Sequence, residues 1–362
     1  MAGDKFYFLE NKVENKRGRD EYNPDGIILN TKIMLSRNLA GQKFVDASSG
    51  SEKNAILDRV RKSVSDIKEF EDLHYHKIRN LKGIQKDLIF REYMIEEDVA
   101  NKVQGRGLFI RPGLNSGVRT AIIVNHEDHI RIQGTSPGLN IRRVYKEVTG
   151  IEKCLEKKLS FAFDDKLGYL TASPFNLGTA LRITVVAHLP VLAISPKIGD
   201  FVKKINNIGC QINSYFSGQP EIVGNLFEIS NRITLGKGEK DIIKEMQAIC
   251  LGIIEDEQDA RKQLKKDDFL GIEDNIYRSF GLLKYAKILS YEEALELLSI
   301  IRLGLDMNMI DGVYDFDYFE MVNKITSSRI MLDMEISGEI SDDRLDLLRA
   351  EIIRKKILKE VD

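Results

Sequence analysis

The chain has 362 residues, of which 43% are hydrophobic and 30% charged, and its formal net charge is −2 at pH 7. This length allows two domains with hydrophobic cores, while the balanced charge argues against direct binding of nucleic acid. No apolar run is long enough to span a membrane, and the start of the chain has no signal-peptide pattern. We therefore expect a cytoplasmic protein.

The first quarter of the sequence predicts a disordered lead-in, an extended segment and a helix. Residues 1–25 are polar and charged, which is typical of a solvated lead-in. Residues 26–38 read as an extended segment that runs into a turn. Between Ser51 and Leu73, apolar residues recur at helical spacing, which predicts an amphipathic helix. Four glycines and Pro112 then mark a loop over residues 104–118.

Residues 119–133 read as a β-hairpin. Residues 120–124 are apolar and largely β-branched, residues 125–128 form a polar turn, and residues 129–133 alternate polar and apolar side chains. The turn and the polar face of the second strand would present Glu127, Asp128, His129 and Arg131 to one space. Carboxylates beside a cation could hold a guanidinium and an anion together, although any half-solvated strand also alternates in this way.

A second unusual stretch follows a predicted helix over residues 140–158 and two short strands at residues 161–163 and 169–171. Pro174 breaks a strand and Gly178 precedes the next one. Arg182 therefore begins a strand directly after a loop, where ligand-binding groups are common. The alternative interpretation is an ordinary surface charge at a strand end.

The remainder of the chain is mostly helical. Helices are predicted over residues 198–208 and 241–265, with a polar loop over residues 213–220 between them. Cys250 lies on the apolar stripe of the second helix, which favours a place in the core. Ser290 begins a capping box, and Ser341 precedes another helix. We expect a first domain over residues 26–258 and a helical domain over residues 259–362.

The three cysteines are far apart and odd in number, which argues against a disulfide framework or a zinc site. We expect no metal ion held by the protein itself.

Several motifs resemble those of the guanidino kinases, the ATP:guanidino phosphotransferases, and in particular the bacterial protein-arginine kinases. They occur in order along nearly the whole chain, and they include residues 125–131, 170–182, 223–231, 277–281 and 301–306. The resemblance implies an α+β fold, with a catalytic domain built on an antiparallel β-sheet flanked by helices and an all-α C-terminal domain that pairs protomers. It also implies transfer of the γ-phosphoryl group of ATP, with magnesium bound to the nucleotide, to an arginine side chain.

The resemblance assigns catalytic roles to three positions. Glu127 matches the carboxylate that orients the substrate guanidinium and accepts its proton, which a guanidinium with a pKa above about 12 does not release to solvent. Asp128 belongs to the same catalytic turn. Ser173 stands where the family has a reactive cysteine, and a hydroxyl does not ionise near neutral pH as a thiol can.

The resemblance also assigns the nucleotide site. Arg131 and Arg182 match two phosphate-binding arginines, and Asn176 lies in the matching loop. Two further phosphate arginines of the family correspond to Lys32, which is still a point charge, and to Met34, which cannot bind phosphate.

Other family positions have changed as well. The loop over residues 213–218 lacks both a fifth phosphate arginine and a second guanidinium carboxylate, unless Glu221 replaces the carboxylate. His126 stands where the family has a glutamate. In the helical domain, Asp346 and Arg349 keep part of a phosphoarginine-binding motif whose first arginine is missing.

Three hypotheses follow from this pattern. The leading one is a protein-arginine kinase homologue with an eroded site and weak or no activity, which acts as a homodimeric binding or regulatory protein in bacterial protein quality control. By resemblance its partners are protein substrates, a stress protease, a repressor and a zinc-containing adaptor. The second is an active kinase with substitute phosphate ligands, and the third is a phosphoarginine-binding module that uses Asp346 and Arg349.

Overall fold

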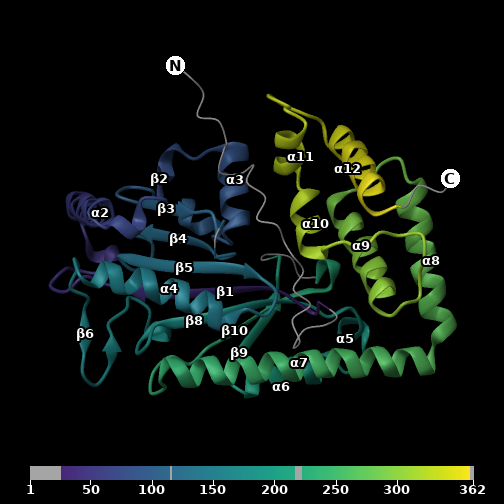
Figure 1. Cartoon of the computed structure of the whole chain (residues 1–362), viewed down its shortest axis with the longest axis horizontal. Coiled ribbons are helices and arrows are strands. Elements are labelled where there is room, and N and C mark those ends of the chain that lie inside the picture. The colour runs from purple at the N-terminus through teal and green to yellow at the C-terminus, as the bar shows by residue number, and fades with distance from the viewer. Residues whose placement is uncertain (1–25, 115, 217–221, 359–362) are drawn as a thin grey trace.

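The computed structural model describes residues 26–114, 116–216 and 222–358, so the predicted lead-in over residues 1–25 lies outside the described part of the chain (Figure 1). The strands are β1 (Ile28–Arg37), β2 (His74–Lys77), β3 (Gly107–Arg111), β4 (Arg119–Val124), β5 (Ile130–Pro137), β6 (Phe163–Asp164), β7 (Gly168–Tyr169), β8 (Leu181–His188), β9 (Cys210–Ser214) and β10 (Leu226–Asn231). The helices are α2 (Gly50–Ser65), α3 (Gly83–Glu92), α4 (Ile141–Glu156), α5 (Pro190–Ile194), α6 (Ile198–Asn207), α7 (Glu239–Asp267), α8 (Phe269–Tyr285), α9 (Tyr291–Asp306), α10 (Tyr318–Lys324), α11 (Ser327–Asp333) and α12 (Asp342–Ile357).

Eight strands form one antiparallel sheet in the order β2-β3-β4-β5-β1-β8-β10-β9. Strand β1 lies near its middle, where it pairs with β5 on one side and with β8 on the other. Helices pack against the sheet, so the predicted antiparallel sheet flanked by helices is confirmed (Figure 1). The predicted hairpin is also confirmed, because β4 and β5 pair directly across the turn.

The two faces of the central strands differ in chemistry because side chains alternate along a strand. Ile33, Leu35 and Ile183 point into the main hydrophobic core, which also contains the buried sides of α4 and α7. Lys32 and Thr184, which are cross-strand neighbours, occupy the other face. The candidate site described below lies on that face.

Helices α8 to α12 form the helical domain beside the sheet (Figure 1). Their core continues into the first domain, because it includes Val186 of β8 and Leu226 of β10. The predicted helical character of the last hundred residues is therefore confirmed, and the side chain of Ser290 caps α9 by accepting from the backbone N–H of Glu293 at 3.1 Å. Among the described helices, none combines the length and apolar character that a membrane span requires.

The 29-residue helix α7 links the two domains, and the predicted boundary at residues 258–259 falls inside it. Glu257 is fully buried on α7 and accepts from the backbone N–H of Leu192 in α5 at 3.0 Å. Arg261, one turn later, pairs with Glu257 at 2.8 Å and with Asp306 of α9 at 3.3 Å. This chain of charges fixes α7 to both domains.

Two local predictions were wrong and one was confirmed. The helix predicted to reach Leu73 ends at Ser65, although Ile67 and Phe70 beyond it are buried and so continue the apolar pattern. The loop predicted over residues 104–118 contains β3, a short buried strand whose flanking glycines resemble turn signals. Cys250 is completely buried, as predicted.

Candidate active site

A cavity of about 460 Å³ lies on the polar face of the sheet. It is lined by Lys32, Met34, Glu96, Asp98, His126, Glu127, Arg131, Ser173, Phe175, Asn176, Arg182, Thr184, Gln211, Glu228 and Arg232. The pairing of the strands explains why lining residues from different strands meet on one face, because Met34 of β1 lies between Gln133 of β5 and Arg182 of β8. Strands that are distant in sequence, the turn between β4 and β5 and the segment after α3 thus bring four cations and four carboxylates to one space.

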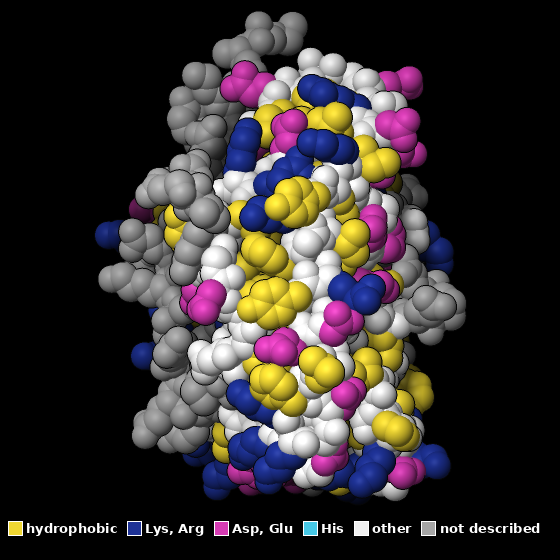
Figure 2. Space-filling model, turned by 90° about the vertical axis from the view of Figure 1, so that its right-hand side faces the viewer, with side chains coloured by type: hydrophobic (Ala, Val, Ile, Leu, Met, Phe, Trp, Pro, Cys, Tyr) yellow, Lys and Arg dark blue, Asp and Glu magenta, His cyan; other side chains and the backbone are white. Residues whose placement is uncertain are grey.

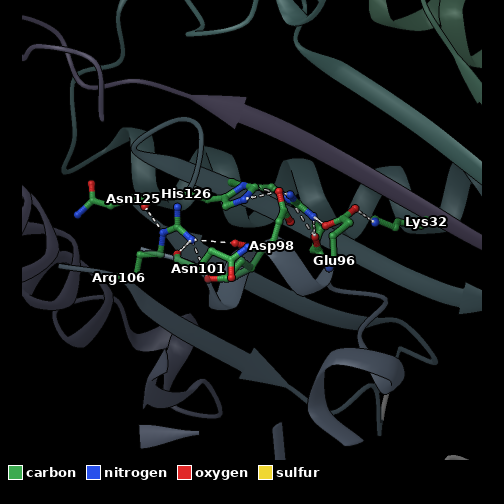
Figure 3. A network of polar contacts seen from close by, with 10 residues as sticks. Lys32, Glu96, Asp98, Asn101, Arg106, Asn125 and His126 are labelled. Atoms are coloured by element: carbon green, nitrogen blue, oxygen red, sulfur yellow. Dashed lines mark hydrogen bonds and ion pairs between the residues drawn. The ribbon is translucent and has the colours of Figure 1, made fainter. Parts of the chain in front are cut away.

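Glu96 joins two of the cations, and it follows α3 in a segment for which the sequence predicts no role. One carboxylate oxygen of Glu96 lies 2.5 Å from Nζ of Lys32, and the other contacts Nη2 of Arg131 (Figure 3). Lys32 also donates to the backbone carbonyl of Met94 at 2.8 Å. Burial raises the pKa of Glu96, but the charges of Arg131 and Lys32 outweigh burial and hold this pKa well below its usual range. Glu96 is therefore an anion that pairs with both cations and offsets one of their two positive charges.

The turn of the hairpin is held rigidly from behind. Asn125 has a positive φ of 56° and donates to the backbone carbonyls of Lys53 and Gly105, both at 2.8 Å. Nε of Arg106 donates to the carbonyl of Asn125 at 2.7 Å, and Figure 3 shows this arginine beneath the turn. This support holds the backbone of the turn that carries Glu127.

Glu127 lines the cavity at the turn and is an exposed residue. Partial burial and the charge of Asp128 raise the pKa of Glu127, while Arg131 and Arg182 act in the opposite direction. A carboxylate with a raised pKa is a better proton acceptor than an ordinary glutamate. The role of Glu127 as the acceptor of the guanidinium proton stays a prediction.

Asp128 and His129 lie behind the turn and do not line the cavity. Of the four hairpin residues that the sequence predicts to face one space, only Glu127 and Arg131 line the cavity. Asp128 is 1% exposed, and its Oδ1 accepts from Asn38 at 2.6 Å and from the backbone N–H of Ala172 at 2.7 Å. Nδ1 of His129 accepts from the backbone N–H of Leu39 at 3.0 Å. In this structure Asp128 anchors the loop that carries Ser173.

That loop brings two predicted residues to the cavity. Ser173 precedes the short 3-10 turn Pro174–Asn176, and both Ser173 and Asn176 line the cavity. Asn176 is buried, whereas Phe175 between Pro174 and Asn176 is 69% exposed. The structure therefore places Ser173, Asn176 and Arg182 in the same cavity as Glu127.

The predicted phosphoarginine residues lie elsewhere, on α12 of the helical domain, where Arg349 is buried and Asp346 is partly exposed. Arg349 is 2% exposed and donates to the backbone carbonyls of Ile325 at 3.0 Å and of Leu289 at 2.8 Å. Its Nη1 also contacts Asp346. In the described conformation, Arg349 is a buried structural group with no surface on which a phosphate could bind.

Four charged residues that line the cavity receive no role from the sequence, namely Glu96, Asp98, Glu228 and Arg232. Glu228, Ser230 and Arg232 occupy every second position along β10 and just beyond it, so the period-2 pattern could have placed them on one face. No local pattern marks Glu96 or Asp98, because the segment after α3 has no regular alternation.

Comparison with known families identifies the family of the chain. The chain matches the model of the ATP:guanido phosphotransferase C-terminal catalytic domain over residues 55–260. It also matches the protein-arginine kinase McsB C-terminal domain over residues 270–362. The chain belongs to the protein-arginine kinase family of ATP:guanido phosphotransferases.

Protein-arginine kinases of other bacteria are similar in sequence to this chain over most of their length. The chain is 34% identical to the protein-arginine kinase of Pelotomaculum thermopropionicum, with 91% of this chain and 92% of that protein covered. It is 33% identical to the protein-arginine kinase of Halothermothrix orenii, with 91% and 93% covered. The predicted family is confirmed.

Solved structures support the fold. A duplicated taurocyamine kinase from Schistosoma mansoni with bound components of a transition-state analogue matches with a TM-score of 0.59 and 24% identity, over 71% of this chain and 38% of that longer protein. Lombricine kinase matches with a TM-score of 0.56 and 20% identity, over 65% and 67%. The predicted guanidino-kinase fold is therefore confirmed.

The cavity fits the nucleotide that an ATP:guanido phosphotransferase implies. Lys32, Arg131, Arg182 and Arg232 are the cations that line the cavity, and charged donors of this kind bind phosphate oxygens strongly. Bound ATP would supply the phosphoryl group, and magnesium would accompany it. Among the described residues, no group of three or more His, Cys, Asp or Glu side chains is arranged to hold a metal ion.

Proposed function

We propose that this chain is a protein-arginine kinase homologue that binds ATP in the cavity but transfers its phosphoryl group weakly or not at all. In this proposal the chain acts mainly as a binding or regulatory protein in bacterial protein quality control. The observation that carries the proposal is the position of Glu96, whose carboxylate pairs with both Lys32 and Arg131. An anionic substrate has to compete with this carboxylate for two of the four cations.

Two further positions support weak transfer. Met34 lines the cavity directly opposite Arg182 and brings no charge to the position where the family pattern has an arginine. Ser173 occupies the position of the family cysteine. Loss of one preorganised charge donor typically slows an enzyme about 100- to 1000-fold, so several losses together are expected to leave little activity.

A second candidate function, an active kinase with substitute ligands, is favoured by a different observation. Arg182 and Arg232 line the cavity, and within the described ranges neither has an ion pair. Glu127 and Glu228 also line it, so two carboxylates are present to hold a substrate guanidinium. Such a site would retain the charges that phosphoryl transfer needs.

Incubation of the purified chain with labelled ATP and casein distinguishes the two candidates. We expect at most a trace of acid-labile arginine phosphorylation in the wild type and none in Glu127→Gln, because glutamine cannot accept the guanidinium proton. Glu156→Gln, an exposed glutamate at the end of α4, is the matched control and should behave as wild type. Robust phosphorylation that Glu127→Gln abolishes would replace the weak-kinase proposal by the active enzyme.

The pH dependence of any transfer follows from Glu127. Because the pKa of Glu127 is raised, the carboxylate becomes protonated at a higher pH than an ordinary glutamate. Transfer should therefore fall as the pH decreases through this raised value. The ionised carboxylate costs the folded state free energy, so Glu127→Gln should leave the unfolding midpoint unchanged or slightly raised.

We also propose a homodimer formed through α8. Leu270 is 75% exposed, Tyr277 50% and Tyr285 70%, and Ile288 just beyond the helix is 56% exposed. Figure 2 shows hydrophobic side chains along this face of the molecule. Exposed apolar patches of this kind commonly mark protein interfaces. Sedimentation should show a dimer that Tyr285→Glu dissociates, and a wild-type monomer at tens of micromolar concentration would contradict this proposal.

A further inference from the structure

Arg182 and Arg232 both line the cavity on the polar face of the sheet. In the antiparallel register of β8 and β10, Ser230 is the partner of Thr184, and the backbone pairing of the two strands ends at this pair. Beyond it the side chain of Asn231 continues the contact, because its Oδ1 accepts from the backbone N–H of Ile183 at 2.7 Å. Arg182 and Arg232 each follow two residues beyond the Ser230–Thr184 pair, so both belong to the same end of the two strands.

These two arginines differ from the other two cations of the cavity. Lys32 and Arg131 share Glu96, whereas neither Arg182 nor Arg232 has a carboxylate within ion-pair distance in the part of the chain that the structure describes. Two like charges that share one cavity repel each other. A pair of guanidinium groups without a counter-charge is therefore a position at which an anion is favoured.

Glu228 also lines the cavity, but among the described residues it forms no ion pair with either arginine. Burial raises the pKa of Glu228, while Lys32 and Arg182 act in the opposite direction. The neighbouring polar side chains, Asn176 and Gln211, are uncharged. A tetrahedral phosphate group suits two guanidinium forks, since each fork can donate two parallel hydrogen bonds.

We propose that Arg232 is a phosphate-binding residue of the nucleotide site, and that together with Arg182 it supplies the charge that Met34 does not. The inference rests on the proposed nucleotide binding and adds a ligand that the family pattern does not assign. It predicts that the phosphates, and not the nucleoside, depend on Arg232.

Calorimetry with adenosine, AMP and MgADP tests this assignment on the full chain. Loss of a charged hydrogen-bond donor typically weakens binding about 10- to 100-fold, so Arg232→Ala should weaken MgADP binding by this factor and AMP binding less, with no change for adenosine. Arg232→Lys should recover part of the loss. Arg59→Ala, an exposed arginine on α2, is the matched control and should leave all three affinities unchanged.

The possible outcomes separate the inference from the proposed function. If the wild type and Arg232→Ala bind MgADP with equal affinity, the proposed role of Arg232 is overturned, whereas the proposed nucleotide site is not. An equal loss for all three ligands would indicate a structural role and would also overturn it. If the wild type binds no MgADP, both the inference and the proposed nucleotide site fail. Circular dichroism should show an unchanged fold for Arg232→Ala and Arg232→Lys, because the side chain is exposed.

Discussion

Replacement of Glu96 by glutamine is expected to tighten the binding of MgADP about tenfold. In the free protein, the carboxylate of Glu96 occupies Lys32 and Arg131, and both cations become available to phosphate once the negative charge is removed. A charged hydrogen bond contributes about 1.5–3 kcal/mol. We expect the lower end of this range, since the Glu96 side chain is 47% exposed and solvent screens its charge.

The same substitution should lower the stability of the protein without nucleotide. The pKa of Glu96 is depressed in the folded state, so its ion pairs stabilise the fold at pH values above the ordinary pKa of a glutamate and are lost as the pH falls through the depressed value. At neutral pH the pairs are fully formed. Tighter binding together with lower stability is thus the expected signature of a carboxylate that competes with substrate.

Calorimetry and urea unfolding measure these two effects on one protein preparation. Glu97→Gln is the matched control, because Glu97 is the next residue and pairs with Lys86 at 2.8 Å outside the cavity. Unchanged or weaker MgADP binding in Glu96→Gln would show that Glu96 positions the two cations for phosphate, and would remove the main support for weak activity.

Arg37→Ala is expected to destabilise the protein by about 3–5 kcal/mol, as is typical when one partner of a buried ion pair is removed. Arg37 is completely buried; its Nε donates to Glu152 of α4 at 2.6 Å, and its guanidinium lies 3.4 Å from the centroid of the Tyr169 ring. Nη1 also donates to the backbone carbonyl of Thr179 at 3.2 Å. Arg37 therefore joins β1 to α4 and to the loop that carries Ser173.

The loss should depend on pH. Burial raises the pKa of Glu152, and Arg37 opposes this shift. Without Arg37 the pKa of Glu152 rises further, so the ionised carboxylate costs more in the folded state and the destabilisation should be larger at pH 7.5 than at pH 5.

Urea unfolding at both pH values measures this difference. Arg111→Ala is the control, since its partner Asp72 has a side chain that is 61% exposed and such pairs contribute less than about 1 kcal/mol. Equal, small losses for both variants would contradict a structural role for Arg37.

Local patterns were sufficient for much of the fold. The alternation in residues 129–133 and the polar turn before them predicted the β4–β5 hairpin, which depends on neighbouring residues alone. Helices α4, α6 and α7 followed from apolar spacing in the same way. Strand β3 was missed because its three central apolar residues are too few to outweigh the glycines around them.

The site was predicted only in part, because a cavity joins residues that no local pattern connects. Family motifs marked Glu127, Arg131 and Arg182, and the structure brings them together. The motifs did not mark Glu96, whose two ion pairs depend on the path of the chain after α3.

By itself, the sequence determined the family, the order of the main elements and the chemical types available for catalysis, since these depend on short motifs and on the periodicity of side chains. Only the tertiary structure decided which of the charged side chains have an ion-pair partner. It buried Asp128 and Arg349 among structural partners, paired Lys32 and Arg131 with Glu96, and placed Arg182 and Arg232 in one cavity. Charge pairing depends on distances between strands and loops far apart in the chain, and only the folded sheet sets these distances.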